Sequence, residues 1–282
     1  MTRYPDATVA IRHIPTPWSD MPSSSPNVNG NSSAQVWIPP AKFLDPLLLP
    51  ATDSTAYPDP SVGELALGAV EDFSIDIERA HEFFEALEEI IDRPFFADSE
   101  KLKLSVALVD TSLDFALSVR LLCLSGQLLG ASTCLRSQFE ALVRSVWIFH
   151  CATDNQVSRL NQESLSLETQ QGAKNIPQAT GMLDDLEKLP HLLALTQALR
   201  EFKDCAWQPL NSFVHSGIHA VHRTRFGSPP QLIDQTFRIS NGFCMLGYNH
   251  LAVLTGAPGI QKEIMATTVK FTSVLPAIKS GT

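Results

Sequence analysis

From about residue 69 onward, apolar residues recur every three or four positions, and this spacing restricts the chain to packed helices. The first such segment places Phe73, Ile77, Ala80, Phe84, Leu87 and Ile91 on one stripe of an amphipathic helix. Its reverse side is rich in acids and is expected to face solvent. The sequence has no alternating apolar and polar run bounded by hairpin turns. We therefore predict an all-α fold, built as a helical bundle.

The bundle is expected to contain one central helix and several others whose ends are marked by glycine and proline. The central helix begins after a cap at Asp98 or Ser99, ends before Gly126, and is apolar on nearly all sides. Further helices are expected at about residues 128–152, 180–188, 191–206, 208–223, 231–255 and 259–275, and an exposed helix followed by a loop is expected within 154–180. In the 208–223 helix, Pro209 lies in the first turn, where proline is tolerated.

The chain divides into two parts of different composition. Residues 1–60 hold 11 of the 19 prolines and a serine-rich stretch, so they predict a largely irregular arm. Residues 61–282 form the predicted helical bundle domain. Two apolar islands in the arm, at residues 36–38 and 43–49, could dock onto the body or onto a second copy, so a homodimer is one expectation.

Composition excludes several classes of protein. No run approaches the roughly 20 apolar residues of a membrane span, and the N-terminus lacks the features of a secretory signal. We therefore expect a cytoplasmic protein with no membrane contact. The five cysteines have no paired spacing and are expected to be reduced, buried thiols.

The net charge of -9 is concentrated in one block. Residues 61–110 carry thirteen acidic and four basic side chains, which accounts for the whole charge, while the rest of the chain is balanced. The chain therefore lacks the basic surface of a general nucleic-acid binder, and any contact with RNA has to be local.

The most distinctive polar pattern is a group of three histidines within eight residues. On one helix, Asn211, His215, His219 and His222 would fall within a stripe of roughly 80°, with Arg223 directly after them. Histidine exchanges a proton near neutral pH, so this stripe suggests acid/base catalysis, metal binding or anion contact. The residues between His215 and His219 lack the glutamate of a zinc-protease motif, and a third ligand would have to be Glu140 or His222. We expect no metal.

A second polar stripe interrupts the apolar helix at 128–152. Arg136, Glu140 and Arg144 stand at positions i, i+4 and i+8 and share one side. One interpretation is a structural ion network that fixes the packing of the helix. The other is a polar pocket in which either arginine holds an anionic group such as a phosphate, and Glu140 orients the arginines or a histidine.

The segment from Asn211 to His215 resembles part of the Arg-polar-x-x-x-His motif of the HEPN superfamily of all-α bundles, which includes many bacterial toxin and phage-defence ribonucleases. The resemblance implies an up-down helical core with extra helices, and metal-independent RNA cleavage assisted by the histidine and the arginine. Asn211 matches the polar position and His215 the histidine, whereas the arginine position is occupied by Leu210. Arg136 or Arg144 would have to supply the charge.

Two hypotheses from different classes follow. The first is a HEPN-like protein acting on RNA or a nucleotide, with His215 as general acid/base. Its other candidate catalytic residues are His219, Asn211 and Glu140, and its candidate phosphate- or ligand-binding residues are Arg136, Arg144, His222 and Arg223. The second is a non-catalytic helical module that binds a ligand or protein partner, with the same residues forming a structural network. The sequence contains no glycine-rich phosphate loop or dinucleotide fingerprint, so no cofactor is expected.

Overall fold

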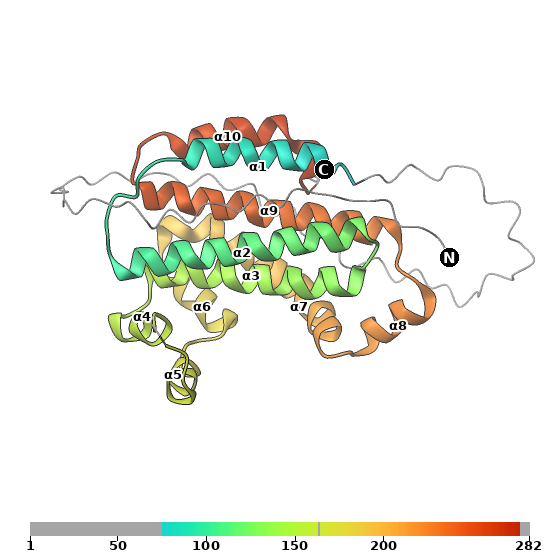
Figure 1. Cartoon of the computed structure of the whole chain (residues 1–282), viewed down its shortest axis with the longest axis horizontal. Coiled ribbons are helices and arrows are strands. Elements are labelled where there is room, and N and C mark those ends of the chain that lie inside the picture. The colour runs from blue at the N-terminus through green and yellow to red at the C-terminus, as the bar shows by residue number, and fades with distance from the viewer. Residues whose placement is uncertain (1–74, 163, 277–282) are drawn as a thin grey trace, which may run out of the picture. The chain divides into compact units, whose positions relative to one another are not determined.

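The computed structural model describes residues 75–162 and 164–276, and these form α-helices and short 3-10 helices without any strand (Figure 1). In chain order the elements are α1 (Ile77–Ile91), α2 (Glu100–Leu124), α3 (Leu128–His150), α4 (Asp154–Leu160), α5 (Leu167–Ala173), α6 (Ala179–Leu186), η3 (Pro190–Leu192), α7 (Leu193–Val214), α8 (Ile218–Phe226), α9 (Pro230–Thr255), α10 (Ile260–Lys270) and η4 (Thr272–Val274). The predicted all-α bundle is confirmed. The arm at residues 1–60, with its apolar islands, and Phe73 lie outside the described residues.

The three long helices α2, α3 and α9 pack together and form the centre of the described bundle. Helices α1 and α10 cover α9 on one side, and α6 and α7 cover α3 on the other (Figure 1). Among the described residues, no helix has the length and apolar character needed to span a bilayer. The candidate site residues lie on α3, α7 and α8 and at the turn between α7 and α8, on the side of the bundle away from the acid-rich α1 (Figure 1).

The predicted ends of the central helix α2 are confirmed. The Ser99 side chain caps its start by accepting a hydrogen bond from the Leu102 N–H at 3.2 Å. Gly126, with φ +68°, reverses the chain into α3. Helix α2 is not enclosed on all sides, however, because it packs mainly against α3 and α9 and leaves its remaining side to solvent. A ridge of three leucines stays partly exposed, formed by Leu117, Leu121 and Leu124.

A buried polar contact fixes the packing of α3 against α9. The Gln138 amide donates to the Ser240 backbone carbonyl at 2.9 Å and accepts from the Ser240 hydroxyl at 2.7 Å. On the other side, the Ser112 hydroxyl of α2 donates to the Gln138 backbone carbonyl at 3.0 Å. Since buried polar groups are costly when unpaired, these reciprocal bonds favour one relative position of the three helices.

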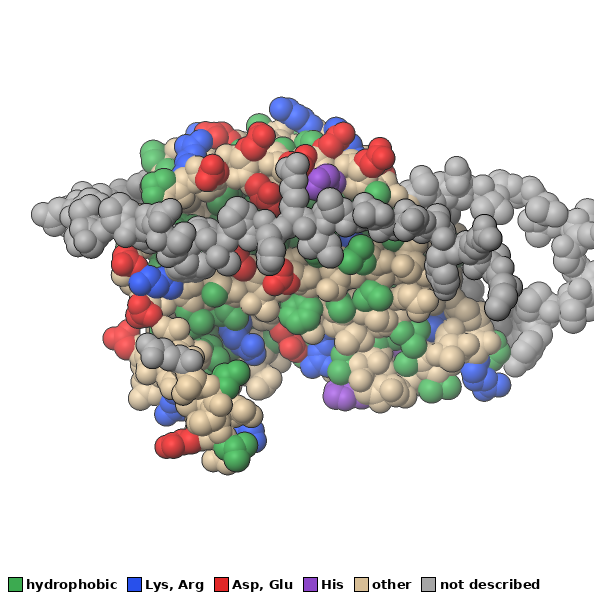
Figure 2. Space-filling model, in the orientation of Figure 1, with side chains coloured by type: hydrophobic (Ala, Val, Ile, Leu, Met, Phe, Trp, Pro, Cys, Tyr) green, Lys and Arg blue, Asp and Glu red, His purple; other side chains and the backbone are tan. Residues whose placement is uncertain are grey.

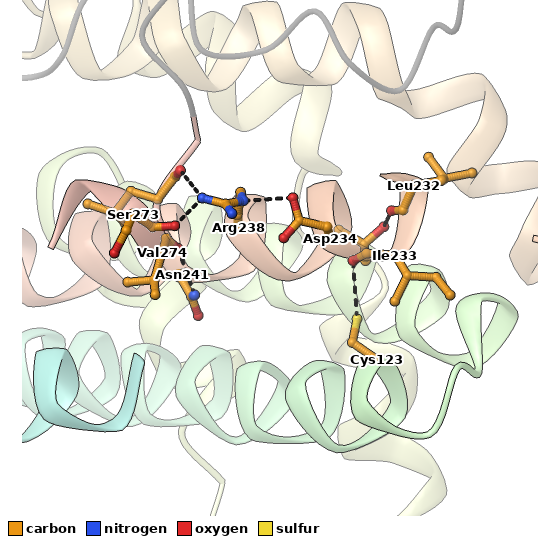
Figure 3. A network of polar contacts seen from close by, with 10 residues as sticks. Cys123, Leu232, Ile233, Asp234, Arg238, Asn241, Ser273 and Val274 are labelled. Carbon is orange, nitrogen blue, oxygen red and sulfur yellow. Dashed lines mark hydrogen bonds and ion pairs between the residues drawn. The ribbon is translucent and has the colours of Figure 1, made fainter. Parts of the chain in front are cut away.

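The C-terminal η4 turn is attached to α9 through Arg238 (Figure 3). This guanidinium pairs with Asp234 at 2.7 Å and donates to the backbone carbonyl of Ser273. One turn further along α9, the Asn241 amide donates to the Val274 carbonyl at 2.9 Å. The η4 turn is thereby held by side chains of α9 that point toward it.

A matched pair of glycine variants tests the turn that follows α9. Gly256 has φ +63°, and a Cβ there would lie 2.9 Å from the Phe96 Cβ, whereas Gly126, at φ +68°, has open space around it. We expect Gly126→Ala to lower the unfolding free energy by about 1 kcal/mol, from backbone strain alone. Gly256→Ala adds a clash and should lower it by about 2 kcal/mol. Urea denaturation measures both, and equal losses would contradict the crowding at Gly256.

The predicted boundary near Pro209 is wrong. Helix α7 continues through Pro209 to Val214, so the predicted helices 191–206 and 208–223 do not exist as such. The buried residues of α7 form one uninterrupted stripe on both sides of the proline, consisting of Leu195, Leu199, Phe202, Ala206, Leu210 and Phe213. Burial of this stripe offsets the cost of a proline inside a helix, roughly 3 kcal/mol.

Candidate functional site

The predicted histidine stripe is bent into two parts at a corner between α7 and α8. Helix α7 ends at Val214, and Ser216 adopts φ +54°. The Gly217 N–H then donates to the Ser212 carbonyl at 2.7 Å, which is the hydrogen bond of a Schellman ending. His215 therefore follows the end of α7, while His219 and His222 belong to α8. The expected single helix carrying all three histidines is wrong.

Ser212 and Gly217 together hold the corner in shape. The Ser212 Oγ accepts a hydrogen bond from the His219 N–H at 2.9 Å, so a side chain of α7 caps the first turn of α8. A Cβ at position 217 would lie 2.6 Å from this Oγ, which explains why glycine occupies the position. The Ser216-Gly217 pair is a turn signal visible in the sequence. It marks the break that helical spacing alone does not reveal.

The polar side chains at this corner are accessible to solvent. His215, His219 and His222 are exposed, and Asn211 and Arg223 are half-buried. The His219 ring lies 6.2 Å from the Phe213 ring, which packs at the end of α7. We name Asn211, His215, His219, His222 and Arg223 the corner site. It is an open surface site and not an enclosed bundle pocket.

The corner site is free of acidic residues in an otherwise acidic chain. Between Asp204 and Asp234 the sequence contains no Asp or Glu, although the whole chain has a net charge of -9. In Figure 2, acidic side chains gather over α1 and α10, whereas the visible surface of α8 shows none. Within this segment, therefore, no side chain carries a negative charge that would repel an anion.

The arginine stripe of α3 contacts α7 through Arg136. Arg136 forms an ion pair with Glu140 at 3.1 Å, and its guanidinium carbon lies 4.7 Å from the centre of the Trp207 ring. The Lys203 ammonium lies 5.2 Å from the same ring. Trp207, which was not among the sequence candidates, thus has two cations near its ring and lies one helical turn before Asn211.

Arg144 differs from Arg136 in having no counter-ion. It is half-buried, and within the described residues it makes no ion pair or hydrogen bond; its Nε is buried and unpartnered. One guanidinium N–H group of Arg136 is likewise buried without a partner. No hydrogen bond or ion pair among the described residues joins Arg136, Glu140 or Arg144 to the corner site. Arg136 approaches α7 at Trp207, one turn before Asn211, and no contact among the described residues joins the two predicted stripes.

A third polar cluster, which the sequence did not reveal, lies at the other end of α3. The His150 ring lies 5.4 Å from that of His191 and 6.0 Å from that of His250. The His250 Nε2 is 2.9 Å from the Ser105 Oγ, which in turn donates to the Ser145 carbonyl at 3.0 Å. These residues come from α2, α3, η3 and α9, so no short motif could have identified them.

Burial controls the protonation of this cluster. Desolvation, followed by the charge of His150, lowers the pKa of His250 to about 3. Desolvation, followed by the charges of His191 and Lys101, lowers the pKa of His150 to about 4. Both imidazoles are therefore neutral near pH 7. Across residues 75–162 and 164–276, no three His, Cys, Asp or Glu side chains are placed to hold a metal ion.

One comparison with known proteins gave a match, and it is to a protein family. A family model described as "Family of unknown function (DUF6988)" matches residues 109–277, which is more than half of the chain and includes the corner site and the arginine stripe. No curated protein and no solved structure matches the chain.

Proposed function

The chain belongs to this family of unknown function, DUF6988, and from the residues of the corner site we propose that it acts on RNA or a nucleotide, cleaving a phosphodiester without a metal ion. The observation on which the proposal rests is the exposure of three imidazoles within a segment of the chain, residues 205–233, that contains no Asp or Glu. An anionic substrate would otherwise be repelled by a chain of net charge -9.

The proposed reaction needs one base and one acid. His215 takes the proton of a ribose 2′-hydroxyl, whose oxygen attacks the adjacent phosphorus and expels the 5′-oxygen. His219 gives a proton to that leaving oxygen, and the products are a 2′,3′-cyclic phosphate and a free 5′-hydroxyl. The two imidazoles lie on either side of the turn at Ser216 and Gly217, which fixes their relative positions.

The negative charge of the phosphate has to be neutralised by residues other than the one at position 210, where the motif has its arginine. Leu210 is fully buried, so nothing at that position can contact a phosphate. Arg223 follows His219 by one turn on α8, and Asn211 lies one turn before His215. These side chains can donate hydrogen bonds to the phosphate oxygens. Arg136 lies on α3 at the ring of Trp207, where Glu140 already neutralises its charge.

Cleavage of RNA in the presence of a chelator tests this proposal. Purified wild type, His215→Ala and His81→Ala are incubated with total RNA and EDTA, and the products are separated on a gel. His81 is an exposed histidine on α1 and serves as the matched control. We expect chelator-resistant cleavage by wild type and His81→Ala, and a loss of about 100-fold or more in His215→Ala, the usual effect of removing a general base.

Two results would contradict the proposal: equal cleavage by wild type and His215→Ala, or no cleavage by wild type. A second function, a non-catalytic module that binds a ligand or partner, is favoured by the closed Arg136–Glu140 ion pair on Trp207. If the His215→Ala and wild-type proteins differ only in melting temperature, the corner site is structural and this second function is preferred.

A further inference from the structure

Helix α8 has its apolar side chains on the side that faces solvent. Ile218 is 78% exposed, Val221 52% and Phe226 53%, while Ala220 is the buried residue that packs inward. At 100° per residue, Ile218, Val221 and Arg225 share one side, and His222 and Phe226 flank it. An amphipathic helix normally shows the opposite arrangement. The outward face of α8 is therefore built to contact something other than water.

Rings and cations are combined on this face. The His222 ring lies 4.8 Å from the Phe226 ring, and the Arg225 guanidinium carbon lies 5.1 Å from the centre of the same ring. Arg223, two residues before Arg225, lies on the other side of α8 and is half-buried, so Arg225 is the permanent cation of this face. With no acidic residue between Asp204 and Asp234, nothing on the helix neutralises these charges. The occupant should thus be anionic and should offer flat apolar groups.

We infer that the outward face of α8 binds an unpaired RNA strand, with bases stacked on Phe226 and His222 and a phosphate paired with Arg225. This inference rests on the proposed function and names its substrate class as single-stranded RNA. Bases can stack on a protein ring only when they are free of a duplex, because an A-form helix hides their faces. The neighbouring imidazoles of His219 and His215 would then lie beside the bound strand.

The number of cations also favours a single strand. The one guanidinium group of this face can neutralise about one phosphate, so the slope of log affinity against log salt should be only about -0.7. A duplex binder depends on many more phosphate contacts and shows a much steeper slope. Stacking must therefore supply most of the affinity on α8, and it requires unpaired bases.

Fluorescence anisotropy with labelled RNA tests this inference. The proteins carry His215→Ala so that the RNA stays intact, and the probes are a 12-nucleotide single strand and a blunt duplex of the same sequence. We expect at least tenfold tighter binding of the single strand, and about tenfold weaker binding after Phe226→Ala, within the range of one lost stack. Arg225→Gln should reduce the salt slope by about 0.7. The control Leu167→Ala removes an exposed apolar residue of α5 and should change neither.

The outcomes separate this inference from the proposed function. Binding of the single strand through Phe226 without cleavage by wild type upholds the inference and rejects the catalytic role of His215. Cleavage by wild type with binding unaffected by Phe226→Ala overturns the inference alone. Absence of RNA binding, together with a dimer in light scattering that Ile218→Glu converts to a monomer, overturns it as well and identifies the face as a contact between copies.

Discussion

Leu210→Arg is expected to prevent stable folding, although an arginine at this position would complete the sequence motif. Leu210 is fully buried: its exposed fraction is 0%, and it belongs to the main hydrophobic core. A guanidinium there would be buried without a counter-ion, which costs about 3–5 kcal/mol. Loss of the leucine packing adds to this cost. The total is a large share of the stability of an ordinary domain, about 5–15 kcal/mol.

The matched control is Val214→Arg, one turn further along the same helix. Val214 is partly exposed at the end of α7, so an arginine there can reach water. We expect its unfolding free energy to stay within about 0.5 kcal/mol of wild type. Urea denaturation followed by circular dichroism compares the two variants. Normal stability of Leu210→Arg would mean that position 210 can reach solvent, and would reopen it as a functional arginine position.

Acidification from pH 7 to pH 5 is expected to destabilise the fold through its buried imidazoles. The pKa of His250 is lowered to about 3 in the folded protein, compared with about 6.5 in the unfolded chain. Below pH 6.5 the unfolded chain therefore binds a proton that the folded protein does not. Stability falls as the pH drops from about 6.5 to about 3, and at pH 5 His250 alone accounts for a loss of about 2 kcal/mol. His150, with a pKa of about 4, acts in the same direction.

The surroundings of His250 and His150 explain why neither imidazole is protonated near pH 7. His250 lies within a hydrogen-bonded group of α2 and α3, and the charged or titratable groups that face it and His150 are Lys101 and His191. All of these are cationic when protonated, so none would stabilise an imidazolium. Protonation also has to occur away from water, which adds the cost of desolvation.

Unfolding free energies of wild type and His250→Gln at pH 7, 6 and 5 test this prediction. The glutamine amide can still bond to Ser105 but does not titrate. We expect the variant to be less stable than wild type at pH 7, yet to lose less stability on acidification. His81→Gln replaces an exposed histidine and should leave the wild-type slope unchanged. Identical slopes for wild type and His250→Gln would show that His250 is not responsible for acid sensitivity.

The helix boundaries that depend on local signals could be predicted well. The Ser99 cap, the stop at Gly126 and the ends of α9 are encoded within a few residues of each boundary, so their positions agree with expectation. The prediction failed at Pro209, where the apolar stripe from Leu195 to Phe213 continues through the proline. Tertiary burial there outweighs a local signal, and a reading based on the proline alone places a boundary where none exists.

The corner site could be predicted only in its residue types. Helical spacing placed Asn211, His215, His219 and His222 on one stripe, but Ser216 and Gly217 turn the chain between them. The shape of that turn depends on the Ser212 Oγ reaching the His219 N–H, a contact between the ends of two helices. Spacing rules assume one continuous helix, so they cannot describe such a contact.

Local periodicity is thus sufficient to establish that the chain forms helices and which side of each one is apolar, because both properties depend on neighbours three and four residues away. It contains no information on which helix faces which. That Arg136 lies on Trp207, and that His150, His191 and His250 converge although they are far apart in the sequence, follows from the packing of α3 against α7 and α9. Such packing depends on the combined shapes of many side chains, and no single segment specifies it.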